Sequence, residues 1–270
     1  MSSRGPETVV KEEFVNSLAR GLAVIRAFGP DRPQMTLSEV AAATNLNPAV
    51  ARRFLLTLVR LGYAGRDGKN FMLRPRVLEL GAGYLASINI AQIVQPHLQA
   101  LRDATGDGAS LTTLDGQDII HVCHVPARRL YRLVVTNGTR IVANPTAPGR
   151  VMLAHLDPES LEQFMSGVRL EPRTGRTVTS VTRFREVLAE VRERGYAVVI
   201  DEDEYGVSGI AAPVFDGVAV VGAVSCVGPT RDVTEEEFIS ARLPELRTAV
   251  RQISEELSRF PAFAHSVRWG

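Results

Sequence analysis

Histidine and cysteine side chains near the middle of the chain are the first candidates for chemistry. His121, Cys123 and His124 stand close together in an apolar run, a composition that could hold a metal ion or activate a thiolate. On a strand, however, successive side chains point to opposite faces. We therefore expect His121 and Cys123 to share one face and His124 to lie on the other, which prevents a two-histidine chelate. Packing in the core is the favoured interpretation.

Three further motifs could mark an enzyme, but none has the context that its chemistry requires. Residues 81–86 read GAGYLA, which resembles a dinucleotide-binding turn but lies inside a helical pattern and follows no strand. Ser208 lacks the GxSxG spacing of a nucleophile elbow. The acidic run at 201–204 (DEDE) could bind a metal or supply a base, yet such a run is more often a solvated turn. We expect no catalytic residue, no metal and no cofactor.

Basic side chains offer a different chemistry, the binding of an anionic polymer. The whole chain has a formal net charge of only +1, but residues 1–80 hold 12 Arg or Lys against 7 Asp or Glu, and the remainder holds 19 against 23. The basic character therefore gathers at the N-terminal end, which favours nucleic acid as a partner of that part of the chain.

One basic helix is predicted at residues 47–63 (NPAVARRFLLTLVRLGY). Its apolar residues recur three and four apart, and Arg52 and Arg53 fall outside that stripe. Asn47 is a suitable N-cap, and Gly62 is a suitable stop. The pattern indicates a helix with one buried side and one exposed basic side.

The elements around this helix predict a winged helix-turn-helix. An amphipathic helix at 15–28 comes first, with Leu18, Leu22, Ile25 and Phe28 on one face. A capping-box pattern, TLSE at 36–39, then opens a short helix that a three-residue turn joins to the basic helix. A DG hairpin signal at 67–68 follows, as a wing requires. The predicted DNA-binding residues are Thr36, Asn47, Ala49, Val50, Arg52, Arg53, Thr57, Arg66 and Lys69.

The rest of the chain predicts an α+β domain in which helices frame antiparallel strands. Helical patterns cover 75–87, 90–104, 143–154, 158–165, 183–194 and 234–260, and strand-like runs cover 109–114, 119–125, 130–136, 196–200, 209–214 and 218–227. Such a domain suits a sensor of small molecules or a small enzyme.

Cysteine use and apolar runs indicate the compartment. The chain has two cysteines and no CxxC pair, so we expect a reducing compartment, the cytoplasm. Residues 1–13 are polar and lack the apolar centre of a signal peptide. The apolar stretch at 210–227 is broken by Pro213, Asp216 and Gly217, a pattern typical of a hairpin and not of a membrane span.

Several motifs together resemble the IclR family of bacterial transcriptional regulators, over about residues 14–260. They are FVNSLARGLAVIRAF at 14–28, ARRFLLTL at 51–58 followed by LGY at 61–63, LELG at 78–81, and IAAPV at 210–214. Within the family the chain looks most like the subgroup that controls the catabolism of aromatic acids through the β-ketoadipate route.

The resemblance implies a domain order and an assembly. We expect a disordered arm at 1–13, a winged helix-turn-helix at 14–74, a linker helix at 75–89, a GAF-like effector domain at 90–260 and a tail at 261–270. The expected assembly is a homodimer or a dimer of dimers on a palindromic operator, acting as a repressor or an activator. Ala49 and Val50 replace a Ser-Thr pair common among relatives, so they could meet thymine methyl groups.

The resemblance also implies an effector pocket for a small carboxylic acid. By analogy its lining is Leu130, Leu133, Ile141, Ala147, Pro148, Val207, Gly209 and Ser225. Pro148 has no N–H, Gly209 stands where a cysteine is common, and Val227 stands where glyoxylate-type relatives have a serine. A pocket poor in donors favours an aromatic acid, or a catabolite of one, over a two-carbon acid. Two alternatives stay open: an enzyme with a DNA-binding appendage, and a DNA-binding protein without a ligand.

Overall fold

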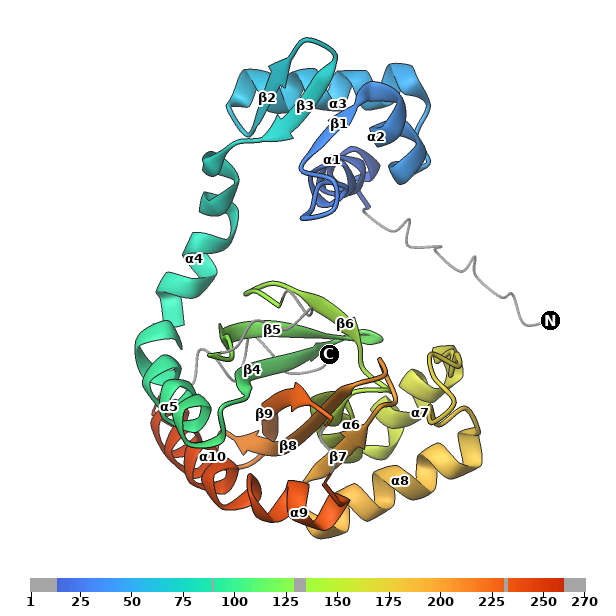
Figure 1. Cartoon of the computed structure of the whole chain (residues 1–270). Helices are drawn as coiled ribbons and strands as arrows, with labels where there is room; N and C mark the ends of the chain where they lie inside the picture. The colour runs from blue at the N-terminus through green and yellow to red at the C-terminus, as the bar shows by residue number, and fades with distance from the viewer. Residues whose placement is uncertain (1–13, 89, 129–134, 231–232, 260–270) are drawn as a thin grey trace, which may run out of the picture. The chain divides into compact units, whose positions relative to one another are not determined.

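The computed structural model describes residues 14–88, 90–128, 135–230 and 233–259, and the chain divides into two compact units, Met1–Gly83 and Tyr84–Gly270 (Figure 1). The division falls inside helix α4 (Glu79–Ile88), which follows a 3-10 turn at Pro75–Leu78. Within the described residues, no helix combines the length and the apolar run that crossing a bilayer requires.

The N-terminal unit is a winged helix-turn-helix, as predicted. It contains α1 (Asn16–Arg26), β1 (Gln34–Thr36), α2 (Leu37–Thr44), α3 (Pro48–Leu61), β2 (Ala64–Asp67) and β3 (Asn70–Leu73). Thr36 caps α2 in the predicted capping box with Glu39. Asn47 caps α3, and Gly62 ends it in a left-handed conformation with φ 84°. The three strands form an antiparallel sheet in the order β1-β3-β2, which carries the wing.

Helix α1 corrects one expectation about the apolar face of residues 15–28. Val24 and Phe28 enter the core of the unit, but Leu18 is 62% exposed and Leu22 is 47% exposed. The stripe predicted from spacing therefore splits: its C-terminal end packs inside the unit, and its N-terminal part faces outward.

The C-terminal unit is built on a six-stranded antiparallel sheet in the order β6-β5-β4-β9-β8-β7. Its elements are α5 (Ile90–Thr105), β4 (Gly108–Asp115), β5 (Asp118–Val125), β6 (Arg140–Val142), α6 (Ala147–Ala154), α7 (Pro158–Gly167), α8 (Val181–Arg194), β7 (Ala197–Ile200), β8 (Val207–Phe215), β9 (Val220–Pro229), α9 (Glu235–Ser240) and α10 (Leu243–Leu257).

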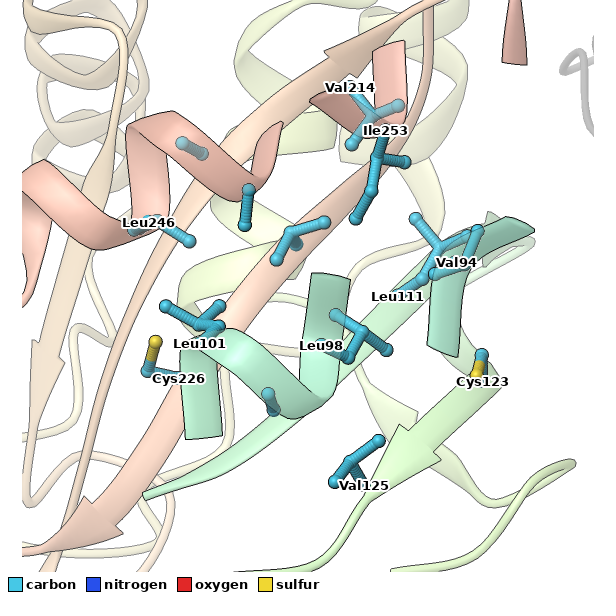
Figure 2. Close-up of a cluster of buried hydrophobic side chains, with 14 of the residues drawn as sticks. Val94, Leu98, Leu101, Leu111, Cys123, Val125, Val214, Cys226, Leu246 and Ile253 are labelled. Atoms are coloured by element: carbon cyan, nitrogen blue, oxygen red, sulfur yellow. The ribbon is translucent and has the colours of Figure 1, made fainter. Parts of the chain in front are cut away.

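Helices cover both faces of this sheet, and each face has its own core. On one face, Leu98 and Leu101 of α5 and Leu246 and Ile253 of α10 pack on alternate strand residues such as Leu111 (Figure 2). On the other face, α6, α7 and α8 bury a second cluster. Successive residues of a strand join different cores, as Ile210 and Ala211 of β8 do, because their side chains point to opposite faces.

One strand differs from the prediction. The strand-like run at 130–136 lies mostly outside the described residues, while Arg140–Val142 forms the edge strand β6 against β5. The four residues between NGT at 137–139 and NP at 144–145 are too short a run to show alternation, so the pattern did not reveal β6.

Helix α6 is the element that fits most tightly, since all eight of its residues are buried. A Cβ atom on Gly149 would lie 2.0 Å from the carbonyl oxygen of Ala143, closer than any real Cβ contact. Only glycine fits there, and its absence of a side chain lets α6 lie directly against the backbone that precedes it.

We predict that Gly149→Ala destabilises the protein by about 3 kcal/mol or more, because backbone atoms must move to admit the methyl group. Urea unfolding measures the change. The matched control is Gly81→Ala in α4, where no described atom lies within 4 Å of the new Cβ and a gain of about 0.5–1 kcal/mol is expected. An equal effect of the two substitutions would contradict this account of α6.

Candidate functional site

A cavity of about 490 Å³ lies in the C-terminal unit, within the size range of small-molecule sites. Its floor is the sheet face that also carries α6, with contributions from β4, β5, β8 and β9. Ile141 of β6, the N-terminal end of α6 and the loop at 203–206 complete the wall.

Six of the eight residues expected in an effector pocket line this cavity: Ile141, Ala147, Pro148, Val207, Gly209 and Ser225. The other two, Leu130 and Leu133, lie outside the described residues. The structure thus brings the six together from β6, α6, β8 and β9, although their contact with a ligand stays a prediction.

For the two histidines of β5, the prediction from alternation that they lie on opposite faces is wrong. Leu111 of β4 pairs with Cys123, but the next residue, Thr112, pairs with His121, so Val122 is the extra residue of a β-bulge. The bulge brings His121 and His124 to the same cavity wall, with ring centroids 6.0 Å apart and edge to face. Cys123 instead packs in the core under α5, and its burial raises the pKa of the thiol to about 11.

Sequence reasoning also missed the polar groups that accompany these histidines. Ser110 of β4 lines the cavity, and its Oγ lies 2.8 Å from His124 Nδ1. Thr146 lines it too and caps α6, accepting the Gly149 N–H at 3.1 Å. An alternating pattern places a serine on a face only when strand register and bulges are known, so no signal in the sequence marked Ser110 as a cavity residue.

The cavity lacks a cationic side chain among the described residues that line it, whereas Asp203 and Glu204 supply carboxyl groups. Burial raises the pKa of Asp203, against the opposing effect of Arg173, whose Nε lies 2.5 Å from Asp203 Oδ1. Among these described residues, a negative charge on a ligand would be stabilised by hydroxyls, backbone amides and the positive end of α6.

A buried ion pair holds the loop at 201–206 against α6. The guanidinium of Arg150 donates to both carboxylate oxygens of Glu202, at 2.6 and 2.5 Å. The pair is tied further: Arg150 Nε donates to the carbonyl of Asn144, and the N–H of Val178 donates to Glu202. Four segments of the C-terminal unit therefore meet at one bidentate contact, and two of them carry cavity residues.

The N-terminal unit presents the predicted DNA-binding residues, most of them exposed. Asn47, Ala49, Arg52, Arg53, Thr57, Arg66 and Lys69 are exposed, and Thr36 and Val50 are half-buried. Two hydroxyls already have partners, because Thr36 bonds to Glu39 and Thr57 donates to the carbonyl of Arg53. These two residues are therefore weaker candidates for base contacts than the sequence indicated.

The exposed arginines of α3 differ from arginines of the C-terminal unit in whether they form ion pairs. Arg52, Arg53 and Arg60 form no ion pair with any described residue. In the C-terminal unit, by contrast, arginines such as Arg183 and Arg185 pair with glutamates. Free guanidinium groups on an exposed helix face can meet phosphates without first breaking an internal pair.

The wing keeps one basic side chain ordered at its tip. Arg66 Nε donates to the carbonyl of Gly68 at 2.9 Å, and the guanidinium lies 5.7 Å from the centre of the Phe71 ring. Lys69, in the hairpin turn itself, is exposed. Both residues lie at the tip of the wing, and their contact with the DNA backbone stays a prediction.

The buried histidine generates a prediction about stability and pH. Burial, with a smaller effect of His124, lowers the pKa of His121 from 6.5 to about 4. In the unfolded chain His121 therefore binds a proton at a higher pH than in the folded protein. The free energy of unfolding falls as the pH drops from about 6.5 to about 4. Between pH 7 and pH 5 we expect His121 to account for a loss of about 2 kcal/mol.

Urea unfolding of the wild type and of His121→Gln at pH 7, 6 and 5 measures this loss. The variant should lose about 2 kcal/mol less than the wild type over that range, since glutamine does not titrate. His124, whose pKa burial also lowers, is present in both proteins and cancels in the comparison. Identical pH profiles would show that His121 titrates normally in the folded protein.

Comparisons with known proteins agree with both units. A model of the IclR helix-turn-helix domain matches residues 17–68, and a model of the bacterial transcriptional regulator IclR C-terminal region matches residues 82–255. In structure, the chain is similar to a candidate transcriptional regulator from Rhodococcus sp. RHA1, with 40% identity, a TM-score of 0.79, and coverage of 91% of this chain and 99% of that one.

Two relatives are similar over most of their length. The Pca regulon regulatory protein of Pseudomonas putida is 35% identical over 247 residues, covering 91% of this chain and 85% of that protein. The p-hydroxybenzoate hydroxylase transcriptional activator of Acinetobacter baylyi is 31% identical over 253 residues, covering 92% and 93%. With both family models matched in order along one chain, this protein belongs to the IclR family of bacterial transcriptional regulators.

Proposed function

We propose that this regulator binds operator DNA through its N-terminal unit and that an aromatic carboxylic acid, or a catabolite of one, controls that binding from the cavity of the C-terminal unit. The cavity carries the proposal, since about 490 Å³ of largely apolar space with a few neutral polar groups suits a ring with polar substituents. A two-carbon acid would leave most of that space unfilled.

The names of two relatives support the same ligand class. One is a regulator of the Pca regulon, and the other activates transcription of p-hydroxybenzoate hydroxylase. The positive end of α6 suits the carboxylate of such an acid, with Ala147 and Thr146 at its first turn. Gly209 and Val227 leave that part of the wall without a further hydroxyl or thiol.

Calorimetric titration with 4-hydroxybenzoate, protocatechuate and β-ketoadipate tests the ligand class. We expect at least one of the three to bind at micromolar to millimolar concentration and glyoxylate not to bind, because the two-carbon acid buries little apolar surface. Binding of glyoxylate with none of the three larger acids would overturn the proposal.

For the DNA, we propose that α3 enters the major groove and that the wing meets the backbone. Arg52 and Arg53 would contact phosphates or groove edges, and Ala49 and Val50 would pack on thymine methyl groups. The unpaired arginines support this, and so does the exposure of Lys69 at the wing. The remaining predicted contacts, at Asn47, Thr57, Arg66 and Thr36, belong to the same surface.

We further propose that the protein acts as a homodimer or a dimer of dimers on a palindromic operator. Leu18 and Leu22 lie four apart on the exposed side of α1, at 62% and 47% exposure, and Phe14, just before the helix, is 64% exposed; a second copy would cover these side chains. Sedimentation equilibrium reads the assembly directly, as a multiple of the 29.4 kDa chain. A palindrome fixes the separation of two half-sites, so an acid could act by biasing their spacing.

The proposed role is regulatory and non-catalytic, in the cytoplasm where the DNA is. It assigns residues 14–74 to DNA binding, 75–89 to a linker and 90–260 to the effector. The competing proposal, an enzyme with a DNA-binding appendage, would require the bound acid to change chemically. Chromatography of the acid after incubation separates the two proposals, since a regulator returns its ligand unchanged.

We predict that Arg53→Ala weakens operator binding roughly tenfold, because it removes a charge-assisted contact to the DNA, and lowers the slope of log affinity against log salt by about one. Fluorescence anisotropy with a labelled duplex measures both quantities. Acid binding, measured by calorimetry, should be unchanged.

The matched control for that experiment is Arg251→Ala, which removes an exposed arginine from α10 in the other unit. It should leave both DNA binding and acid binding at the wild-type level. A parallel loss of both activities in Arg53→Ala would indicate a folding defect and remove the evidence for a DNA contact.

A further inference from the structure

A row of neutral polar side chains crosses the floor of the cavity. Ser110 on β4 is paired in register with His124 on β5 on one side and with Ser225 on β9 on the other. Because neighbouring strands lie about 4.8 Å apart, the row extends over roughly 10 Å, the length of a benzene ring with a substituent at each end. His121 lies on the same face beside this row, opposite Thr112 of β4, because of the bulge at Val122.

Within the part of the chain that the structure describes, two of these four side chains have no hydrogen-bond partner. Ser110 and His124 bond to each other at 2.8 Å. Neither Ser225 Oγ nor either ring nitrogen of His121 has a hydrogen-bond partner among the described residues, although the two side chains are only 1% and 5% exposed. Buried polar atoms nearly always have a partner, so these two side chains in a cavity wall point to a ligand group that bonds to them.

The charges around His121 select the kind of group. The described lining contains no arginine or lysine, and Asp203 and Glu204 are the charged residues in it. Burial and the neighbouring ring of His124 both act against a positive charge on His121. A neutral imidazole offers one N–H donor and one nitrogen acceptor, which matches a hydroxyl group, itself both donor and acceptor. A second carboxylate would find no arginine or lysine among the described lining residues.

We propose that His121 is a specificity-determining residue that selects an aromatic acid with a ring hydroxyl, by hydrogen bonding to that hydroxyl on the floor of the cavity. The proposal rests on the proposed function, since it assumes that an aromatic acid occupies this cavity. It adds that the ring of the acid must carry a neutral hydroxyl group, and it identifies His121 as the residue that recognises this group. Ser225, the other unsatisfied member, lies two strands away from β5 in the same sheet.

Calorimetry with matched acid pairs tests the proposal on the full-length protein. The pairs are 4-hydroxybenzoate with 4-fluorobenzoate and 3-hydroxybenzoate with 3-fluorobenzoate, in which fluorine keeps the size of the substituent but donates no hydrogen bond. For the wild type we expect the hydroxy acid to bind at least about tenfold more tightly than its fluoro partner at one ring position, because the fluoro acid leaves His121 unpaired.

Two variants locate that preference. His121→Phe keeps a ring of similar shape but has no nitrogen, so the ratio should fall to about twofold or less while the fluoro acids still bind. His121→Gln keeps a donor and an acceptor, and it should retain part of the preference. It also carries the test should the phenylalanine variant fail to fold. The matched control is His155→Gln, which alters a histidine of the same unit that bonds to Val151 outside the cavity and should keep the wild-type ratio.

The possible results distinguish the role of His121 from the proposed effector on which it rests. Tight binding of both members of each pair without preference, or a preference that survives in His121→Phe, would overturn the role of His121 and leave the aromatic effector standing. No binding of any of the four acids to the wild type would overturn the role of His121, and the titrations with protocatechuate and β-ketoadipate would then decide whether the proposed effector class stands.

Discussion

Helix α6 is buried on all sides, and the C-terminal unit is arranged around that constraint. A fully buried helix needs a close backbone approach, which Gly149 permits against Ala143, and a partner for its one charged residue, which Glu202 provides to Arg150. Removing one member of such a buried pair typically costs about 3–5 kcal/mol, because it strands a charge in the interior. The pair therefore fixes where the cavity wall can lie: the first turn of α6 and the loop after β7 must remain in contact.

The chemistry of the cavity follows from that arrangement. Two arginines near it are already paired: Arg150 with Glu202, and Arg173 with Asp203, which lines the cavity. What remains on the sheet face is apolar surface crossed by serines and histidines, a setting that favours a ring over a small charged acid. The N-terminal unit shows the opposite pattern, since the exposed arginines of α3 form no ion pair with any described residue. One unit thus leaves arginines of α3 unpaired, and the other has no arginine or lysine among the described residues that line its cavity.

Local signals in the sequence were sufficient for the DNA-binding unit, because caps and turns depend on neighbouring residues. Thr36 with Glu39, Asn47 and Gly62 each formed the predicted cap or stop, and the predicted hairpin formed with its turn one residue later, at Gly68 and Lys69. The face of α1 could not be predicted, since spacing reports that Leu18 is apolar but not that other elements leave it exposed. Six pocket residues came from family resemblance. His121 did not, because one extra residue at Val122 reverses the alternation, and a bulge is decided by pairing with β4.

The central claim is that binding of an acid in the cavity changes the affinity of the protein for DNA at α3, and that DNA binding changes the affinity for the acid. The direct measurement is the affinity for an operator duplex, selected from random sequence by the protein itself, with and without saturating 4-hydroxybenzoate, together with the affinity for the acid with and without the duplex. Coupling must be reciprocal, so both ratios should agree, at roughly 5- to 150-fold. An acid that binds in the cavity and changes neither its own affinity in the presence of DNA nor the affinity for DNA would contradict the account.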